Sequence, residues 1–262
     1  MQRLAVQQRR LLGDRAGWHP GDLAWQRWQH AGREDEWDIR VWGERAWSWL
    51  RLETGNLDLD VGSGHEELLD EILAESRAQT AWAFDDDEPH LAALRRHGFT
   101  RPAEHFWFLA RDLAEPPDPP PLPDGFRLRT VGAGDLAERV AVHRDVWAPS
   151  RVTEESFANV QRAWPYRESL DCVVEAPDGR FAAYALLWPD DENGVGELEP
   201  VGVRDEFRRR GLGAAVCTFA LRRLYEEGGR EAIVYCVTDA ACGLYESIGF
   251  RRHATLVGYS RS

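Results

Sequence analysis

The stretch Glu199-Pro-Val-Gly-Val-Arg-Asp-Glu-Phe-Arg-Arg-Arg-Gly-Leu-Gly-Ala214 joins a strand pattern to a helix pattern. Within it, Arg208-x-x-Gly211-x-Gly213 places a basic run and two glycines where the helix is predicted to begin. Glycine lets the main chain take turns that a β-carbon would block, and the amide groups at a helix start attract anions. The arginines add charge and paired donors for phosphate oxygens. This stretch therefore predicts a site for a pyrophosphate that carries a long polar tail.

The composition describes a globular, acidic chain without lysine. Its 262 residues suit two domains, and 43% hydrophobic residues are enough for a core. The formal net charge of −13 opposes nonspecific binding to nucleic acid and favours cationic or neutral substrates. All 32 basic residues are arginine. Neither a lysine Schiff base nor a Walker-type phosphate lysine is therefore possible.

The cysteines and the first ten residues indicate the cellular compartment of the protein. Cys172, Cys217, Cys236 and Cys242 form no Cys-x-x-Cys pair, so we interpret them as small buried residues in a reducing compartment. The first ten residues lack the apolar core of a signal peptide, and no stretch is apolar enough to span a bilayer. We therefore expect a cytoplasmic protein that does not bind membranes and has no metal site.

A proline-rich segment at 114–125 is the predicted domain boundary. It reads Ala114-Glu-Pro-Pro-Asp-Pro-Pro-Pro-Leu-Pro-Asp-Gly125, and proline favours the extended, semi-rigid polyproline form. The predicted units are therefore a first domain at 1–113, a linker at 114–125, and a second domain at 126–262.

The second domain has a regular alternation of strand and helix patterns. Asp135, Thr153 and Asp239 are the predicted helix caps. A Pro177-Asp-Gly179 turn joins two of the strands. The predicted elements are strand 126–130, helix 135–144, helix 153–163, strands 171–175, 180–188 and 196–203, helix 213–227, strand 231–237, a short helix from 239 to 249, and strand 252–259.

A second motif follows the first at the distance of one helix and one strand. It reads Thr238-Asp-Ala-Ala-Cys-Gly-Leu-Tyr-Glu-Ser-Ile-Gly-Phe250. The two motifs in this order resemble those of the GCN5-related N-acetyltransferase (GNAT) superfamily, over Gly125 to about Tyr259. The resemblance implies an α/β (α+β) fold in which a mixed, mostly antiparallel sheet with splayed central strands is flanked by helices. It also implies acetyl-CoA as cofactor, with coenzyme A as product.

The first domain resembles a degenerate copy of the second. Strands are predicted at 38–41, 46–53, 56–61 and 80–84, and helices at 64–77 and 89–97. Its Gly98-Phe99 step mirrors Gly249-Phe250, and Leu94 then falls opposite Tyr245. This half has no Arg-x-x-Gly-x-Gly motif, and an unrelated α/β cap domain is the alternative. The tandem layout resembles that of mycothiol synthase, without a match close enough to assign its substrate.

Pro200 is predicted to interrupt strand pairing beside the cofactor, because proline cannot donate a backbone hydrogen bond. In the family the strands splay at this point, and the free backbone groups can bind the pantetheine amides. Thr238 stands where the family commonly has asparagine. Because threonine can donate one hydrogen bond and asparagine two, the resemblance supports a cofactor contact at Thr238 less strongly. The resemblance assigns cofactor contacts to Val201, Gly202, Val203, Arg208, Arg209, Arg210, Gly211, Leu212, Gly213, Ala214, Thr238 and Ala241.

Amine acetylation needs a base to remove a proton from the ammonium and an acid for the leaving thiolate. Glu197, four residues before Val201, matches the family's base, and Glu199 is its competitor on the same strand face. Tyr245 matches the general acid. A covalent route through Cys217 or Cys242 is the alternative, although neither has a histidine base nearby in the sequence.

The family's first two helices border the acceptor, and here that region carries five candidate side chains. They are His143, Trp147, Arg151, Trp164 and Tyr166, of which we select Trp147, Trp164 and Tyr166 as substrate contacts. The predicted reaction is acetyl transfer to a primary amine of a small molecule within a ternary complex, by a monomer or weak homodimer. The alternatives are a noncatalytic acyl-CoA-binding module and a transferase that uses another acyl group.

Overall fold

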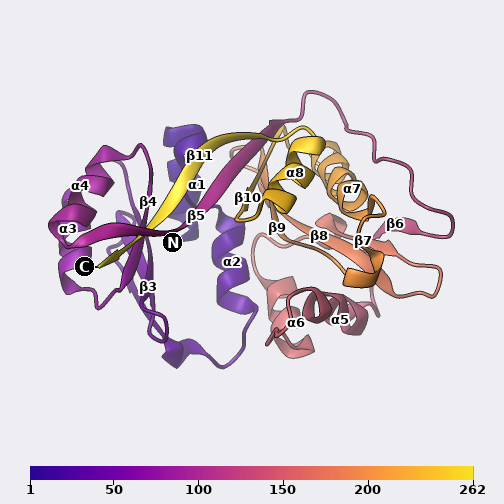
Figure 1. The fold of residues 1–262 in the computed structure, drawn as a ribbon, viewed down its shortest axis with the longest axis horizontal. Coiled ribbons are helices and arrows are strands. Elements are labelled where there is room, and N and C mark those ends of the chain that lie inside the picture. Colours follow the sequence, from indigo (N-terminus) through magenta and orange to yellow (C-terminus); the bar gives the residue numbers. More distant parts are fainter. Residues whose placement is uncertain (262) are drawn as a thin grey trace.

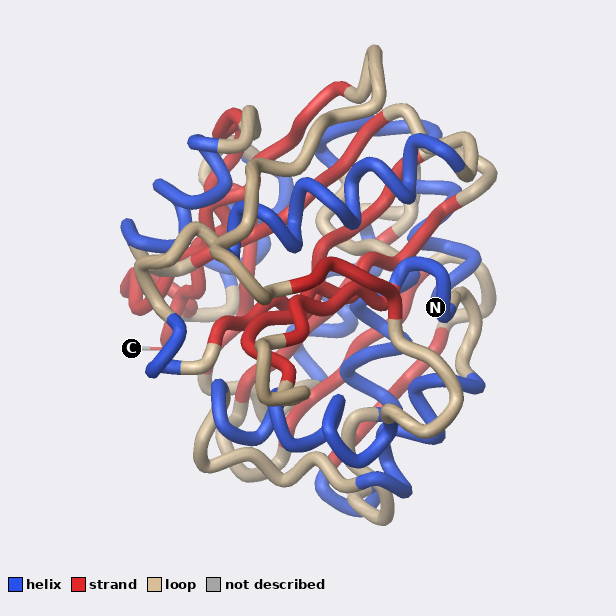
Figure 2. The backbone as a smooth tube through the Cα atoms, turned by 90° about the vertical axis from the view of Figure 1, so that its right-hand side faces the viewer, coloured by secondary structure: helices blue, strands red, loops and turns tan. Residues whose placement is uncertain are grey.

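The computed structural model describes residues 1–261. They form one eleven-stranded sheet in the order β1-β2-β3-β4-β11-β5-β10-β9-β8-β7-β6. All neighbouring strands are antiparallel except two pairs, β3–β4 and β9–β10. Helices lie on both sides of this sheet (Figures 1 and 2). The expected mixed, mostly antiparallel sheet is confirmed, but the two halves contribute to one continuous sheet.

The first half contains more structure than its sequence indicated. The four predicted strands and two predicted helices are present, whereas α1, α2 and the long strand β5 were not predicted. The elements are α1 Gln2–Leu12, α2 Pro20–Trp28, β1 Trp37–Val41, β2 Ala46–Arg51, β3 Asn56–Val61, α3 Glu67–Glu75, β4 Thr80–Phe84, α4 Glu88–Arg96 and β5 Phe99–Asp112.

The second half has the predicted order of elements. They are β6 Arg127–Thr130, α5 Leu136–Val146, α6 Glu154–Arg162, β7 Asp171–Glu175, β8 Phe181–Asp190, β9 Val195–Val203, α7 Leu212–Glu226, β10 Glu231–Cys236, α8 Asp239–Ser247 and β11 Arg251–Arg261.

The helix caps of the second half agree with the sequence in part. Thr153 caps α6 through a hydrogen bond from the Ser156 amide at 3.1 Å. Asp135 occupies the cap position of α5, but its side chain does not cap that helix and binds Arg129 instead. The prediction for α8 was wrong, since Thr238 is the capping residue.

The two halves exchange their last strands. β5 leaves the first half and pairs with β10 of the second, from Glu231 opposite Asp112 to Cys236 opposite Trp107. In return, β11 leaves the second half and pairs with both β4 and β5. Figure 1 shows β5 and β11 as the two long strands that cross between the halves. Each half therefore completes its sheet with a strand from the other.

The linker at 114–125 has no helix or strand and runs along the outer side of the second half (Figure 1). Asp118 forms an ion pair with Arg222 of α7, and Leu122 packs against the core of the second half. These contacts hold the segment against the second half.

Helix α2 belongs to the first half in sequence but packs on the second. Ala24 and Trp25 lie in one buried cluster with Val140, Phe157 and Trp188 of α5, α6 and β8. Figure 1 shows α1 and α2 between the two halves. The first half thus covers part of the face of the second-half sheet that lies opposite α7.

The cysteine prediction was wrong for one pair. Cys236 at the end of β10 and Cys242 in α8 form a disulfide, because the turn between these elements brings together residues that show no recognisable spacing. Cys172 and Cys217 are free and buried, as predicted. Among residues 1–261, no helix combines the length and the apolar character needed to cross a bilayer.

Candidate functional site

The parallel strands β9 and β10 separate at Glu197. Their pairing runs from Val195 opposite Glu231 to Glu197 opposite Ile233 and then stops, although β9 continues to Val203. On its other side, β9 stays paired with β8, with a register shift near Glu199 and a cis Glu199–Pro200 peptide bond. Within residues 1–261, no strand pairs with the β10-facing edge of β9 after Glu197. The predicted splay is present, and it leaves a backbone edge available to an extended ligand.

The splayed strand leads to the open start of α7. Gly211 is the N-cap residue, adopts a left-handed conformation with φ of 77°, and provides no side-chain cap. The amides of Leu212, Gly213 and Ala214 have no acceptor within the helix, because the first turn of any helix lacks one. Arg208, Arg209 and Arg210 are exposed beside this turn. The arrangement provides the amides, helix dipole and charge that bind a pyrophosphate.

The three glycines of this region have different roles. A β-carbon on Gly211 would meet nothing within 4 Å, so this position needs glycine for its positive φ and not for space. Gly213 lies inside α7, where a β-carbon would be 3.3 Å from Leu244 and 3.4 Å from Val203, so it allows close packing of α7 on α8 and β9. At Gly202 a β-carbon would lie 2.7 Å from Val146. The sequence had assigned a turn to both Gly211 and Gly213.

Thr238 and Ala241, two of the predicted cofactor contacts, are hydrogen-bonded to each other. The Thr238 hydroxyl accepts a hydrogen bond from the Ala241 amide at 3.2 Å and so caps α8. Each group already has a partner within the chain, which weakens both as predicted cofactor contacts.

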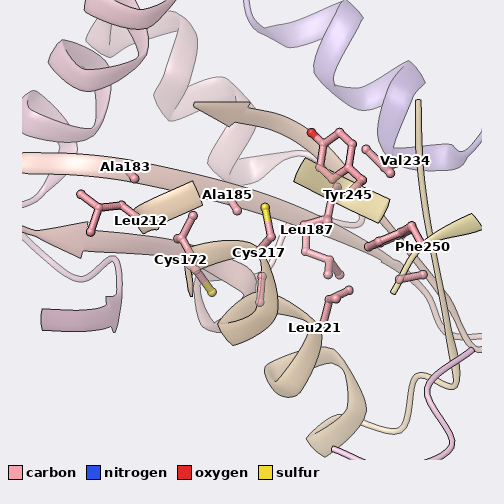
Figure 3. Packing of buried hydrophobic residues seen from close by; sticks show 14 of the residues in the cluster. Cys172, Ala183, Ala185, Leu187, Leu212, Cys217, Leu221, Val234, Tyr245 and Phe250 are labelled. Carbon is pink, nitrogen blue, oxygen red and sulfur yellow. The ribbon is translucent and has the colours of Figure 1, made fainter. Parts of the chain in front are cut away.

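Tyr245 belongs to the core of the second half. The residue is 7% exposed, and its ring lies edge-on to Phe250, with centroids 5.9 Å apart. In Figure 3 its oxygen points away from Leu221 and Phe250. Burial raises the pKa of Tyr245 well above its usual value, and the charge of Glu199 adds to this. The phenol therefore keeps its proton at neutral pH and can donate a hydrogen bond.

The structure argues against the covalent mechanism, in which Cys217 or Cys242 would be the nucleophile. Cys242 is in a disulfide, and burial raises the pKa of the Cys217 thiol to about 12. Neither residue offers a thiolate at neutral pH.

Glu197 and Glu199 have different surroundings. Glu197 is 1% exposed, and its Oε2 lies 3.3 Å from Nδ1 of the buried His19. Glu199 is half-buried and lines a cavity. Burial, together with the charge of Glu199, raises the pKa of Glu197 to about 8. Burial, together with the charge of Asp22, raises the pKa of Glu199 to about 8 as well.

That cavity has a volume of about 410 Å³ and lies between the two halves. Trp25 and His30 from the first half face His143, Trp147 and Glu199 from the second. The rest of its lining is Gln29, Arg33, Pro149, Ser150, Arg151 and Pro200. The cavity therefore combines indole rings with a carboxyl group of raised pKa, which suits a small polar amine.

A hydrogen-bonded network fixes one wall of this cavity. The Trp147 indole donates to the Tyr184 hydroxyl at 2.7 Å, and Nδ1 of His143 lies 2.9 Å from the same oxygen. Burial, together with the charge of Arg139, lowers the pKa of His143 to about 3, so its ring is neutral. Of the predicted substrate contacts, the structure places only Trp147 here. Trp164 is 56% exposed, and Tyr166 donates to Asp171 at 3.2 Å; neither lines the cavity.

The residues that sequence reasoning missed come from the start of α2, which packs on β8 and β9. They are His19, whose ring lies 3.3 Å from Glu197, and Asp22, and no local signal links positions so distant in the chain. The start of α2 could have been found, because Pro20 occupies the first turn, where proline is favoured.

Comparison with known proteins agrees with this geometry. The model of the acetyltransferase (GNAT) family matches residues 139–250. The mycothiol acetyltransferase of Nocardia farcinica is 32% identical over 207 residues, 74% of this chain and 68% of that protein. The mycothiol acetyltransferase of Actinosynnema mirum is 29% identical over 186 residues, 68% of this chain. That match covers 62% of the relative, so this chain spans less than two thirds of its length.

A solved structure shares the whole architecture. A tandem GNAT protein from the clavulanic acid biosynthesis pathway superposes with a TM-score of 0.69 at 15% identity, covering 98% of this chain and 93% of that one. At this identity the likeness concerns the fold alone, and that fold includes both halves.

Proposed function

Because this chain belongs to the GCN5-related N-acetyltransferase (GNAT) family, we propose that it transfers an acetyl group from acetyl-CoA to a primary amine of a small molecule. One observation carries the proposal: the unpaired edge of β9 leads, through a short turn at Asp205–Phe207, to the open, arginine-flanked start of α7. A thioester on a long amide-containing arm beyond a pyrophosphate has the shape that such a groove accommodates.

The residues present fit this cofactor. The amides of Gly211, Leu212, Gly213 and Ala214, with Arg208, Arg209 and Arg210, would hold the pyrophosphate, and the backbone of Val201 to Val203 would hold the pantetheine arm. Coenzyme A supplies an activated acyl group when bound. The effect of the Glu199 charge on the pKa of Tyr245 supports a site in which both side chains lie near the reacting thioester.

Glu199 is our choice for the residue that takes the proton from the acceptor. It lines the cavity, whereas Glu197 is enclosed beneath it. A carboxylate whose pKa is about 8 accepts a proton from an ammonium more readily than an ordinary glutamate does. The amine nitrogen then forms its bond to the acyl carbon as the carbon–sulfur bond breaks. Tyr245 gives its proton to the leaving thiolate, and the second proton released from the nitrogen returns through the solvent to the Tyr245 phenolate.

The acceptor would occupy the cavity between the halves. Trp25 and Trp147 provide apolar faces, while Arg33 and Arg151 provide donors for hydroxyl or acidic groups. Because several relatives are named mycothiol acetyltransferases, the unacetylated form of mycothiol is the first acceptor to test. The noncatalytic alternative has less support, because a carboxyl group and a phenol suited to the roles of base and acid lie near the splay.

The test is a panel of primary amines, including unacetylated mycothiol, with acetyl-CoA and with longer acyl-CoA thioesters. We expect thiol release that depends on the amine and is fastest with acetyl-CoA. Tight binding of coenzyme A without release for any amine would favour the noncatalytic module. Faster release from a longer thioester would favour the transferase with a different acyl group.

A further inference from the structure

The first half has a strand splay and a cavity of its own. Its parallel strands β3 and β4 stop pairing at Leu57 opposite Ala81, although β3 runs on to Val61 and β4 to Phe84. A cavity of about 350 Å³ is lined by the ends of both strands and by residues at the starts of α3 and α4. We call it the first-half cavity. Its volume is large enough for a small ligand.

The turn before α3 does not offer a pyrophosphate the free amides that the start of α7 offers, because the chain supplies its own acceptors there. The Ser63 amide donates to Oε1 of Gln8 at 3.2 Å, and the Gly64 amide donates to Oε1 of Glu66 at 3.0 Å. Both Gln8 and Glu66 line the first-half cavity. The Glu66 carboxylate therefore takes the place that a phosphate would need, and it repels one.

The charged groups of the first-half cavity are mostly acidic. Its carboxyl groups are those of Asp60, Glu66, Asp86 and Asp87. Among the described residues that line it, Arg15 is the only permanent cation, and it already forms an ion pair with Asp86. Burial lowers the pKa of His90, so its ring is neutral at physiological pH. The lining therefore attracts cations and repels anions.

Two buried polar atoms of this lining have no partner. Oδ2 of Asp60 and Nε2 of His90 form no hydrogen bond within residues 1–261. Nδ1 of His90 lies 3.8 Å from Oδ2 of Asp87, whose charge favours the ring proton on Nδ1 and leaves Nε2 as an acceptor. The charge of the Met1 amino group acts on Asp60, but Met1 does not line the cavity. An ammonium group has only donors, so it suits both unpartnered acceptors.

The apolar wall of the first-half cavity includes the aromatic rings of Trp18, Trp82 and Phe84. The Trp18 indole donates to the carbonyl oxygen of Leu59 at 3.0 Å, which fixes this ring. The same bond occupies part of the β3 edge that the splay leaves unpaired, where a pantetheine arm would need a free carbonyl. Aromatic faces bind apolar groups and attract cations.

We propose that the first-half cavity binds a small organic cation, in which a primary ammonium group is carried on an apolar body. The ammonium group lies toward Asp60 and His90, and the apolar body packs against Trp18 and Trp82. This site shares no lining residue with the acceptor cavity at Glu199. It is therefore independent of acetyl transfer in the second half.

Calorimetry of the full chain with 2-phenylethylammonium tests the proposal, and the uncharged 2-phenylethanol has nearly the same shape. We expect the ammonium probe to bind about tenfold more tightly than the alcohol, with an affinity that saturating coenzyme A leaves unchanged. Asp60→Asn keeps the shape and removes the charge, so it should weaken binding of the ammonium probe about tenfold. Asp87→Asn should weaken it about threefold, because asparagine can still cap α4 through the His90 amide.

Asp58→Asn is the matched control. Asp58 lies two residues before Asp60 on β3, but it is paired with Arg51 and does not line the first-half cavity. Its replacement should leave the affinity for the probe unchanged. Glu199→Gln is the second control, because it alters the acceptor cavity alone, and it should also leave this affinity unchanged.

The possible outcomes separate this inference from the proposed function. The inference is wrong if the parent binds no ammonium probe, binds the alcohol equally well, or releases the probe to coenzyme A. It is also wrong if Glu199→Gln abolishes binding while Asp60→Asn and Asp87→Asn keep it, since the probe then occupies the acceptor cavity. If Asp60→Asn does not fold, unchanged affinity in Asp87→Asn overturns the inference. Charge-dependent binding at Asp60 in a protein that acetylates no amine would support the inference and contradict the proposed function.

Discussion

Gly21 in α2 lies directly against Trp188 in β8, so closely that a β-carbon on Gly21 would be 2.3 Å from Cβ and Cγ of the tryptophan. Both of these tryptophan atoms belong to a side chain that is fully buried. The indole also donates a hydrogen bond to the carbonyl oxygen of Glu199 at 2.6 Å. One contact thus links the position of the first-half helix to the position of the candidate base.

Gly21→Ala should disturb both the fold and the site. The indole cannot move aside without repacking the core, so we expect a loss of about 1–3 kcal/mol in unfolding free energy. Acetylation should also slow, because α2 would move away from Glu197 and Glu199. Chemical denaturation and turnover measurements check this. Gly243→Ala in α8 is the control, since a β-carbon there meets nothing within 4 Å, and it should stabilise the protein by about 0.5–1 kcal/mol.

Gly211→Ala should weaken coenzyme A binding through strain alone. The left-handed backbone at this position costs an alanine about 1–2 kcal/mol, which corresponds to roughly a tenfold loss of affinity if the loop moves to relieve it. Gly211→Asn should lose less, because asparagine tolerates this conformation better. Calorimetry with coenzyme A measures both variants. Equal affinities for the parent and the alanine variant would remove this turn from the cofactor site.

Tyr245→Phe should lower turnover and leave binding nearly intact. Phenylalanine keeps the buried ring beside Phe250, so only the proton for the leaving thiolate is lost. We expect kcat to fall by about 10²-fold, while the dissociation constant of coenzyme A stays within about threefold. Tyr259→Phe, a partly buried tyrosine of the first-half core, should change neither quantity. A parallel loss of binding and turnover in Tyr245→Phe would indicate a packing role.

Glu197→Gln should change how stability depends on pH. The pKa of Glu197 is raised to about 8 in the folded state, so the folded protein binds this proton more tightly than the unfolded chain does. The contribution of this proton to the free energy of unfolding is fully present below the unfolded pKa near 4.5. It is lost as the pH rises toward 8, by up to about 1.4 kcal/mol per pH unit. Glutamine removes this dependence. Thermal melts between pH 5 and pH 8 should therefore favour the variant increasingly with pH, and a constant difference would contradict the assignment.

Residues 126–262 should not fold alone into a stable monomer. The fragment lacks β5, so the edge of β10 that now faces Leu109 and its neighbours would be exposed. We expect aggregation on expression, and recovery of soluble material when residues 1–113 are produced with it. Circular dichroism and size-exclusion chromatography provide the readout. A soluble, active fragment would show that the exchanged strand is dispensable.

Local patterns in the sequence predicted the parts of the fold that depend on nearby residues. Strands β4 and β7 and the start of α7 were found because hydrophobic periodicity and glycine placement determine them within a few positions. Strand β5 was missed because Pro102 and the polar side chains around it hide the pattern, and its partners lie far along the chain. The long-range pairing, not local preference, makes this segment a strand.

The same distinction holds for the site. The turn at Gly211 could be read from a short motif. The family resemblance implied a splay at Pro200, and in the structure the pairing of β9 with β10 already stops after Glu197. The enclosure of Glu197 by His19 and Asp22 could not, because the contact joins two halves whose docking no local pattern encodes. The sequence consequently favoured Glu197 as the base, whereas its burial and the cavity beside Glu199 favour the second glutamate.

The exchange of β5 and β11 also constrains how the protein is made. β11 follows every other strand in the chain, yet it fills the gap beside β4 in the first half. During synthesis the ribosome therefore releases a first half whose sheet still has an open edge, and this edge stays open until β11 emerges. Neither half can finish folding ahead of the other, so both parts of the sheet are completed only after β11 has been synthesised.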